Sequence, residues 1–166
     1  MTHYRAPQNS HAPQAGIHLL PDTAENFAYF PAFIHVTGKK VLVLGGGEVA
    51  LGKLRLLARS QAVITVIAPE ICDEIALMVN EGRIAWESAP FVDTMINGAV
   101  MVFDATDDPY LTARVQAATK RRNILLNVVD KTPHCDFIVP AILDRAPVMI
   151  TISTGACAPA LARIIR

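Results

Sequence analysis

The sequence predicts an α/β fold in which a parallel β-sheet is followed by a small, truncated α+β segment. From about residue 41 to residue 130, short apolar runs alternate with longer stretches of helical periodicity, which is the pattern of successive βαβ units. Hydrophobic residues make up 52% of the 166 residues and charged residues 18%, as suits strands that are buried on both faces of a sheet. After Asp130 the alternation ends, so we expect a separate segment there.

The first predicted strand runs directly into three consecutive glycines. Residues 41–50 read VLVLGGGEVA, a strand, a turn and a helix start with the spacing G-x-G-x-x-A. In such a unit Gly45 permits the tight turn, Gly47 lets a pyrophosphate approach the backbone, and Ala50 lets the helix pack closely on the strand. The backbone N–H groups expected to face the anion are those of Gly47, Glu48, Val49 and Ala50. The spacing predicts a Rossmann-type unit that binds a dinucleotide; the alternative is a tight turn without a ligand.

The other elements of the sheet follow from the same periodicities. Helices are predicted over residues 48–60, 69–80 and 108–121, and strands over residues 62–67, 84–86, 99–105 and 124–129. Pro69 and Pro109 each stand at the start of a predicted helix, where a missing N–H is tolerated, and Asp108 is the expected N-cap of the third helix. Residues 29–34 are an apolar lead-in that we expect to pack against the sheet.

The chain is expected to divide into three parts. Residues 1–27 are rich in Pro, Gln, Ala and His and are predicted to be a mobile extension. Residues 28–130 form the dinucleotide-binding domain, and residues 131–166 begin a further domain. This last part is predicted to hold strands at 137–139 and 148–152, a turn at 144–147, and a helix from about Pro159. Because that helix reaches Arg166 without a C-cap glycine, residues that belong to this domain are expected to be missing.

Composition excludes several classes of protein. The formal net charge is zero, which argues against nucleic-acid binding. No apolar run reaches the roughly 18 residues of a membrane span, and the start lacks the apolar core of a signal peptide. Three widely spaced cysteines, Cys72, Cys135 and Cys157, are expected to be free thiols in a reducing cytoplasm.

Polar residues follow the predicted strands at the edge where a ligand binds an open parallel sheet. Thr106 and Asp107 follow the strand at 99–105 and are assigned to the cofactor. The strand at 62–67 is followed by Ala-Pro-Glu, with no base to hold a 2′-phosphate, so NAD is favoured over NADP. Asp130 follows the strand at 124–129, where a carboxylate can accept a proton from a substrate that gives up a hydride. The alternative for Asp130 is a residue that only forms the turn.

Other polar residues have structural interpretations. Asp108 is expected to cap its helix, and Asp104, inside an apolar strand, needs a partner that the sequence does not name. His134, Cys135 and Asp136 resemble a metal cluster, but consecutive residues of an extended chain point to opposite faces. No metal-ligand set is therefore assigned.

An ordered set of motifs resembles siroheme synthase, and more closely its precorrin-2 dehydrogenase/sirohydrochlorin ferrochelatase part. The likeness covers about residues 29–166. The motifs that carry it are GGGEVA (45–50), ATDD (105–108), NVVD (127–130), DFIVPA (136–141), DR (144–145), ISTG (152–155) and Pro159 with LAR (161–163).

The resemblance implies an NAD-dependent oxidation of precorrin-2 to sirohydrochlorin, followed by insertion of ferrous iron, as a substrate, to give siroheme. Carried over, Asp130 serves both steps, and Asn127, Ser153, Thr154 and Gly155 lie at the tetrapyrrole. Hydroxyls and backbone N–H groups of this last turn can also bind the substrate's carboxylates on chemical grounds. The family further implies a homodimer that exchanges its second domain, so residues 131–166 are expected to mediate dimerisation.

Two departures and two rival functions accompany this resemblance. Gly52 replaces an arginine often seen in the first helix, and residues 59–61 replace a small turn. The family's C-terminal helical domain is expected to be absent. An NAD-sensing regulatory module would use the same glycine turn without catalysis, but would need neither Asp130 nor residues 136–166. A generic short NAD oxidoreductase would call for a Tyr/Lys pair, and Tyr110 is followed four residues later by Arg114 instead.

Overall fold

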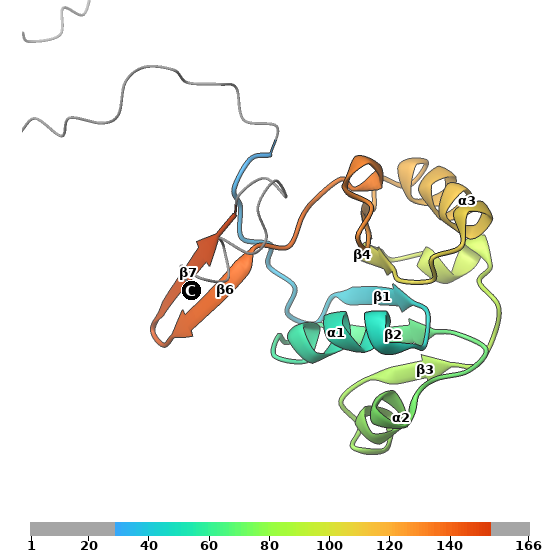
Figure 1. The fold of residues 1–166 in the computed structure, drawn as a ribbon, viewed down its shortest axis with the longest axis horizontal. Helices are drawn as coiled ribbons and strands as arrows, with labels where there is room; N and C mark the ends of the chain where they lie inside the picture. The colour runs from blue at the N-terminus through green and yellow to red at the C-terminus, as the bar shows by residue number, and fades with distance from the viewer. Residues whose placement is uncertain (1–28, 154–166) are drawn as a thin grey trace, which may run out of the picture.

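The computed structural model describes residues 29–153, in which five parallel strands form one sheet (Figure 1). The strands are β1 (Lys40–Leu44), β2 (Val63–Ile67), β3 (Ala85–Glu87), β4 (Ala99–Asp104) and β5 (Leu125–Val128), in the order β3-β2-β1-β4-β5. The helices are α1 (Glu48–Leu57), α2 (Asp73–Asn80) and α3 (Pro109–Lys120), with short 3₁₀ turns η1 (Asp93–Ile96) and η2 (Thr132–His134). The predicted α/β fold with a Rossmann-type sheet is confirmed. The predicted extension at 1–27 and the helix near Pro159 lie outside the described residues.

Each face of the sheet packs against its own helices. Alternate residues of β1 belong to different clusters: Val41 and Val43 pack with α1 and α2, whereas Leu42 and Leu44 pack with α3 and η1. All four side chains are at most 1% exposed, as a strand covered on both faces requires. At about 1.5–3 kcal/mol for each fully buried aliphatic side chain, this strand is a large contributor to the core. No helix within residues 29–153 is long and apolar enough to cross a membrane.

The second helix begins later than the sequence predicts. Helix α2 starts at Asp73, with Cys72 as its N-cap, and not at Pro69. The preceding residues instead pass over the glycine turn, where the Cys72 N–H donates to the Gly46 carbonyl oxygen at 2.8 Å. This tertiary contact holds residues 69–72 out of the helix.

The apolar lead-in is also placed differently from the prediction. Phe30 and Phe33 are 90% and 74% exposed, so residues 29–34 do not pack on the sheet within the described part of the chain. Part of the sheet face near α1 is covered by the linker after β5 instead. Phe137 of this linker packs edge-on against Phe103 of β4, with ring centroids 5.4 Å apart.

The linker after β5 protects the edge of the sheet and is not the strand predicted at 137–139. The Asp136 N–H donates to the Leu126 carbonyl at 2.8 Å, and the Asp136 carboxylate accepts from the Leu126 N–H at 2.9 Å. A backbone and a side chain therefore occupy the unpaired edge of β5, which limits pairing with other strands.

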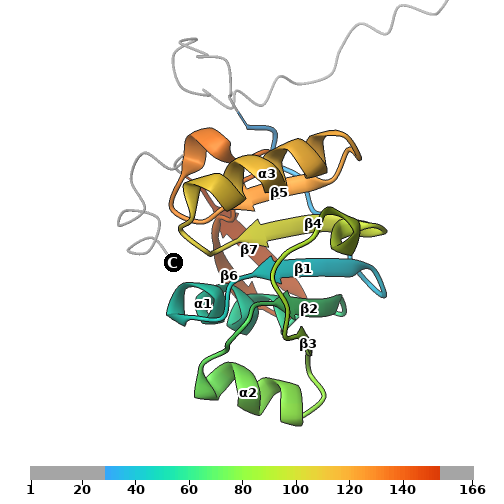
Figure 2. The ribbon, with the colours of Figure 1, turned by 90° about the vertical axis from the view of Figure 1, so that its right-hand side faces the viewer.

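A two-stranded antiparallel hairpin follows the linker. Its strands are β6 (Ala141–Arg145) and β7 (Val148–Ile152), so the predicted strand at 148–152 is confirmed and the other strand comes four residues later than expected. Figure 1 shows the hairpin standing beside the sheet rather than within it. Figure 2 shows it behind the sheet, on the side away from α3. Arg59, after α1, forms an ion pair with Asp144 of the hairpin at 2.8 Å.

Candidate functional site

The glycine turn combines two close backbone contacts with one open position. Gly45 has a φ of +108°, and a Cβ there would lie 2.8 Å from the Ala105 carbonyl oxygen. A Cβ on Gly46 would lie 1.9 Å from the Glu70 carbonyl oxygen, whereas one on Gly47 would meet nothing within 4 Å. The motif spacing treats Gly46 as variable, but the structure requires glycine there; the run of three glycines was the available signal.

Gly47 is the N-cap of α1, and no side chain caps that helix end. The first backbone N–H groups of α1 therefore face open space, where an anion would be stabilised by these donors and by the helix dipole. Ala50 and Leu51 are buried against the sheet, while Glu48 and Val49 are exposed beside the opening. The arrangement is the one that the sequence predicts for holding a pyrophosphate.

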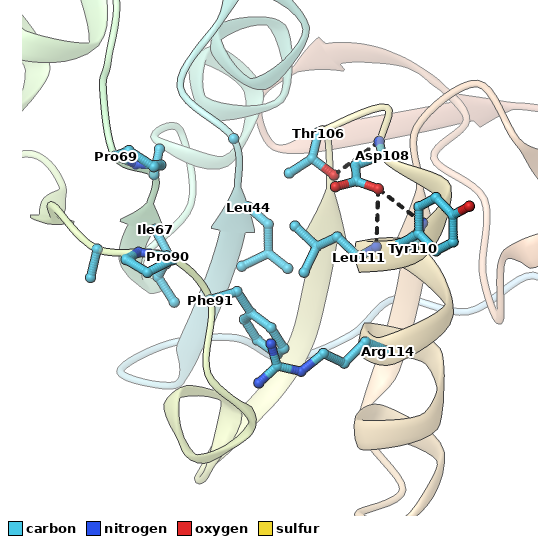
Figure 3. Close-up of a pocket in the computed structure, with 13 residues that line it drawn as sticks. Leu44, Ile67, Pro69, Pro90, Phe91, Thr106, Asp108, Tyr110, Leu111 and Arg114 are labelled. Atoms are coloured by element: carbon cyan, nitrogen blue, oxygen red, sulfur yellow. Dashed lines mark hydrogen bonds between the residues drawn. The ribbon is translucent and has the colours of Figure 1, made fainter.

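A pocket of about 410 Å³ opens beside this turn, at the carboxyl edge of the sheet (Figure 3). Its apolar part comes from the ends of β1 and β2 and from the loop before η1. Its polar rim comes from the loop after β4 and the first turns of α3. The lining residues that Figure 3 labels are Leu44, Ile67, Pro69, Pro90, Phe91, Thr106, Asp108, Tyr110, Leu111 and Arg114. An apolar pocket with few polar groups, next to an anion-binding helix end, suits a nucleoside joined to a pyrophosphate.

Of the residues that line the pocket, the sequence analysis assigned only Gly45 and Thr106 to the cofactor; Phe91, Tyr110 and Arg114 are among those that it missed. Arg114 extends along the Phe91 ring, with its guanidinium carbon 5.5 Å from the ring centroid, and its Nε donates to Asp93 at 2.9 Å. A cation over an aromatic ring contributes about 0.5–1 kcal/mol at an exposed site. Tyr110 and Arg114 are four residues apart on α3, a spacing that could have identified a shared face, whereas Phe91 lies in an irregular segment that offers no such signal.

The loop after β4 is fixed by a network of hydrogen bonds. The predicted cap is confirmed: Asp108 accepts from the N–H groups of Tyr110 and Leu111 at 2.9 and 3.2 Å. The partners that Asp104 needs are the two threonines Thr106 and Thr112. The predicted cofactor residue Thr106 lines the pocket, so the network positions a candidate ligand contact.

Asp107 and Asp130 occupy equivalent places after β4 and β5. Both have a left-handed backbone, with φ of 55° and 60°, a conformation that aspartate tolerates better than most residues. Asp107 forms an ion pair with Lys131 at 2.7 Å, and the hydrogen bond and charge of Lys131 lower the pKa of its carboxyl group. The carboxylate of Asp130 is exposed and has no partner within residues 29–153. The structure thus brings the glycine turn, Thr106, Asp107 and Asp130 to one edge of the sheet.

Asn127 and the residues after η2 tie the linker to β5. Asn127 is 6% exposed and donates to the Phe137 carbonyl at 2.9 Å, so its predicted contact with the substrate stays a prediction. The Cys135 thiol donates to the Val128 carbonyl at 3.2 Å, and burial raises its pKa. His134 instead contacts Gln116, at 3.1 Å. Since His134, Cys135 and Asp136 have separate partners, their arrangement does not favour the metal cluster that their sequence suggests.

Within residues 29–153 one group, elsewhere on the surface, has the geometry to hold a metal ion. Glu48, Cys72 and Glu74, at the starts of α1 and α2, place ligand atoms within 4.8 Å of one another. Exposed acidic groups of this kind are common without an ion.

The turn predicted to bind the tetrapyrrole lies mostly outside the described residues. Ser153 is exposed directly after β7, and Thr154 and Gly155 are not described. The contact of Asp144 with Arg59 joins the hairpin to the end of α1, which lies at the amino edge of the sheet because α1 runs back from the glycine turn. The expectation that residues 153–155 share a cleft with Asp130 stays a prediction.

Comparisons with known proteins agree with this site. The family model described as "Putative NAD(P)-binding" matches residues 32–141. The chain is 44% identical over 138 residues to a siroheme synthase of Photorhabdus laumondii, covering 83% of this chain and 29% of that protein. It is 43% identical over 138 residues to the siroheme synthase of Sodalis glossinidius, with the same coverage. The chain thus spans about three-tenths of the length of these relatives.

A solved structure is similar over most of the described fold. The protein titled SirC, precorrin-2 dehydrogenase, superposes with a TM-score of 0.66 at 25% sequence identity. The superposition covers 82% of this chain and 67% of that one.

Proposed function

The chain belongs to this NAD(P)-binding family, and on that premise we propose that it oxidises precorrin-2 to sirohydrochlorin with NAD, as the dehydrogenase part of a siroheme synthase. One observation carries the proposal: the uncapped start of α1, the adjoining pocket and the unpaired Asp130 carboxylate lie at one edge of the sheet. The likeness to siroheme synthases at 41–44% identity supports the choice of substrate. The relatives named above are enzymes, which gives no support to a regulatory module.

The residues present fit a dinucleotide. Gly47 to Ala50 would hold the pyrophosphate through backbone N–H groups, and the pocket beside Thr106 would hold the adenosine half. Ala68 and Pro69 line the pocket at the end of β2, and the nearby base Arg114 is already paired with Asp93. This lack of an unpaired base supports NAD over NADP.

Asp130 is the group proposed to move the proton. The cofactor, when bound, supplies the hydride acceptor, and the tetrapyrrole must also lose one proton as it is oxidised. The exposed Asp130 carboxylate at the end of β5 can accept that proton as a general base.

The proposal is tested by mixing the purified 166-residue chain with precorrin-2 and NAD. We expect the absorbance of NADH and of sirohydrochlorin to rise together. Tight NAD binding without any turnover of precorrin-2 would contradict the proposal and favour the regulatory module.

Insertion of ferrous iron into sirohydrochlorin is proposed as a second activity of the same edge, with iron as substrate and Asp130 again taking protons as the metal enters. It rests on the resemblance to siroheme synthase. The test is to add ferrous iron after the first reaction is complete and to follow the siroheme spectrum. A rate equal to that without protein would contradict it.

The chain is proposed to work in the cytoplasm, where thiols such as Cys72 and Cys135 stay free.

A homodimer is proposed through the hairpin and the residues that follow it. Val148, Met149 and Ile150 are 55%, 50% and 47% exposed on an isolated pair of strands. Two strands alone are marginally stable in water, and exposed apolar patches mark contacts with other chains. A second copy of the chain would cover this surface.

We expect sedimentation to show a dimer at micromolar concentration. Ile150→Lys should shift the chain toward the monomer, because it places a charge in the proposed contact. Leu77→Lys is the matched control, since Leu77 is 58% exposed on α2, away from the hairpin. A wild-type monomer, or equal effects of the two variants, would contradict the proposed interface.

The turn at 153–155 is proposed to bind carboxylates of the tetrapyrrole, within the dimer. We expect the double variant Thr154→Val, Gly155→Ala to raise KM for precorrin-2 and to leave the affinity for NAD unchanged, because the turn would contact only the substrate. Steady-state kinetics at saturating NAD measure this. An unchanged KM would show that the turn is only a strand–helix connection.

A further inference from the structure

Asp104, the last residue of β4, is a buried carboxylate that the proposed mechanism does not use. It is 1% exposed. Its Oδ1 accepts from the Thr106 N–H at 3.1 Å and from the Thr106 hydroxyl at 2.6 Å, and its Oδ2 accepts from the Thr112 hydroxyl at 2.5 Å. The carboxyl group accepts three hydrogen bonds. A polar group at this depth is costly to bury without partners, so the threonines compensate for its burial.

The carboxylate determines how the Thr106 hydroxyl can meet a ligand. That hydroxyl donates its only proton to Asp104, and its oxygen also accepts from the Asp108 N–H at 3.5 Å. It can therefore offer a ligand in the pocket only its remaining lone pair, as an acceptor. Figure 3 shows Asp108 beside Thr106 on the same rim, with its carboxylate accepting from the start of α3. The rim next to β4 therefore presents acceptors, which favour the hydroxyl groups of a ribose and oppose a phosphate.

The same carboxylate fixes the wall of the pocket that α3 provides. Thr112 lies on α3 and is 4% exposed, so it does not reach the pocket itself. Its bond to Asp104 joins the end of β4 to the helix that carries Tyr110, Leu111 and Arg114 into the lining. Asp104 thus determines the position of Thr106 and of the first turns of α3 together.

We infer that Asp104 is a positioning residue of the nucleotide site: through Thr106 and Thr112 it makes the pocket rim an acceptor for a ribose hydroxyl and favours NAD over its 2′-phosphorylated form. This inference rests on the proposed NAD-dependent function. Asp104 lies behind the pocket wall and touches no ligand, so it acts only through its two threonine partners.

Calorimetry with NAD and with NADP on the full chain tests the inference. We expect Asp104→Asn to weaken NAD about tenfold, on the order of one lost hydrogen bond, and to change NADP little, so that the preference for NAD narrows. Thr112→Val should act in the same direction, and Thr112→Ser should restore the wild-type affinity because it keeps the hydroxyl donor. In turnover, KM for NAD should rise in Asp104→Asn while kcat at saturating NAD stays unchanged.

Two controls distinguish an effect of Asp104 on the position of its threonine partners from a general effect of charge removal or misfolding. Glu81→Gln removes one negative charge at the end of α2, away from the pocket, and should bind NAD as the wild type does. In a Thr106→Val background, Asp104→Asn should cause a smaller loss of affinity than in the wild type, because only its path through Thr112 remains. Thermal unfolding of each variant checks that it is folded; if Asp104→Asn does not fold, the comparison of Thr112→Val with Thr112→Ser decides.

Different results would contradict the role of Asp104 and the proposed NAD-dependent function. Unchanged NAD affinity in Asp104→Asn and Thr112→Val, or an equal loss in Glu81→Gln, would overturn the inference alone. A wild-type chain that binds neither NAD nor NADP would overturn the proposed function together with it.

Discussion

Replacing Asp130 with alanine is expected to lower kcat for precorrin-2 oxidation by about 10²- to 10⁴-fold, the usual contribution of a positioned general base. The affinity for NAD should stay unchanged, because the glycine turn and the pocket do not depend on this side chain. Stopped-flow absorbance of NADH gives the rate, and calorimetry gives the affinity. Ferrous iron insertion should fall as well if Asp130 serves both steps.

Asp130→Asn distinguishes the base from a turn residue. The backbone at Asp130 has a φ of 60°, and asparagine is among the residues that tolerate this conformation, whereas alanine is strained there. If Asp130 only forms the turn, the asparagine variant should be as active as the wild type. If Asp130 accepts the proton, asparagine should be as inactive as alanine, because an amide cannot take this role. Full activity of the asparagine variant would therefore refute the catalytic assignment.

The parts of the fold that sequence predicts well are those fixed by local chemistry. Four consecutive apolar residues before a triple glycine give β1 as expected, and Asp108 before Pro109 caps α3 as expected. Both features depend on neighbours in the chain: the apolar run must be buried, and the short carboxylate reaches the free N–H groups two and three residues later.

The parts that sequence does not predict depend on contacts between distant segments. The start of α2 is displaced because Cys72 bonds to Gly46, 26 residues earlier in the sequence. The edge of β5 is covered by the side chains of Cys135 and Asp136, which accept from the N–H groups of Val128 and Leu126, and the strand expected next, at 137–139, does not form. The lead-in at Phe30 and Phe33 is exposed for a similar reason: Phe137, a distant residue, packs on part of the sheet instead. Hydrophobic pattern alone does not determine which of two apolar segments covers a face.

The second large effect is expected from alanine substitutions at two neighbouring glycines, Gly46 and Gly47. The first should lower the stability of the fold, and the second should lower the affinity for NAD. Gly46→Ala should lower the free energy of unfolding by about 3 kcal/mol or more, because its Cβ would lie 1.9 Å from the Glu70 carbonyl oxygen and 2.9 Å from the Ile71 Cα. These neighbours are backbone atoms, so residues 70–72 would have to move away from the turn. For a chain of this size the loss corresponds to a fall in Tm of roughly 6–12 °C.

Gly47→Ala should leave the stability nearly unchanged and weaken the binding of NAD. Its Cβ would meet no atom within 4 Å, and its φ of −93° is accessible to any residue, so the stability cost should be only about 1 kcal/mol, from the weaker N-cap. The new methyl group would, however, occupy the space in front of the α1 N–H groups where the pyrophosphate is proposed to lie. We therefore expect the affinity for NAD to fall by about tenfold or more while Tm changes little. Calorimetry and thermal unfolding on both variants measure the two effects. A Gly47→Ala chain that binds NAD as tightly as the wild type would show that the open helix end does not hold the cofactor, whatever the stability of the Gly46 variant.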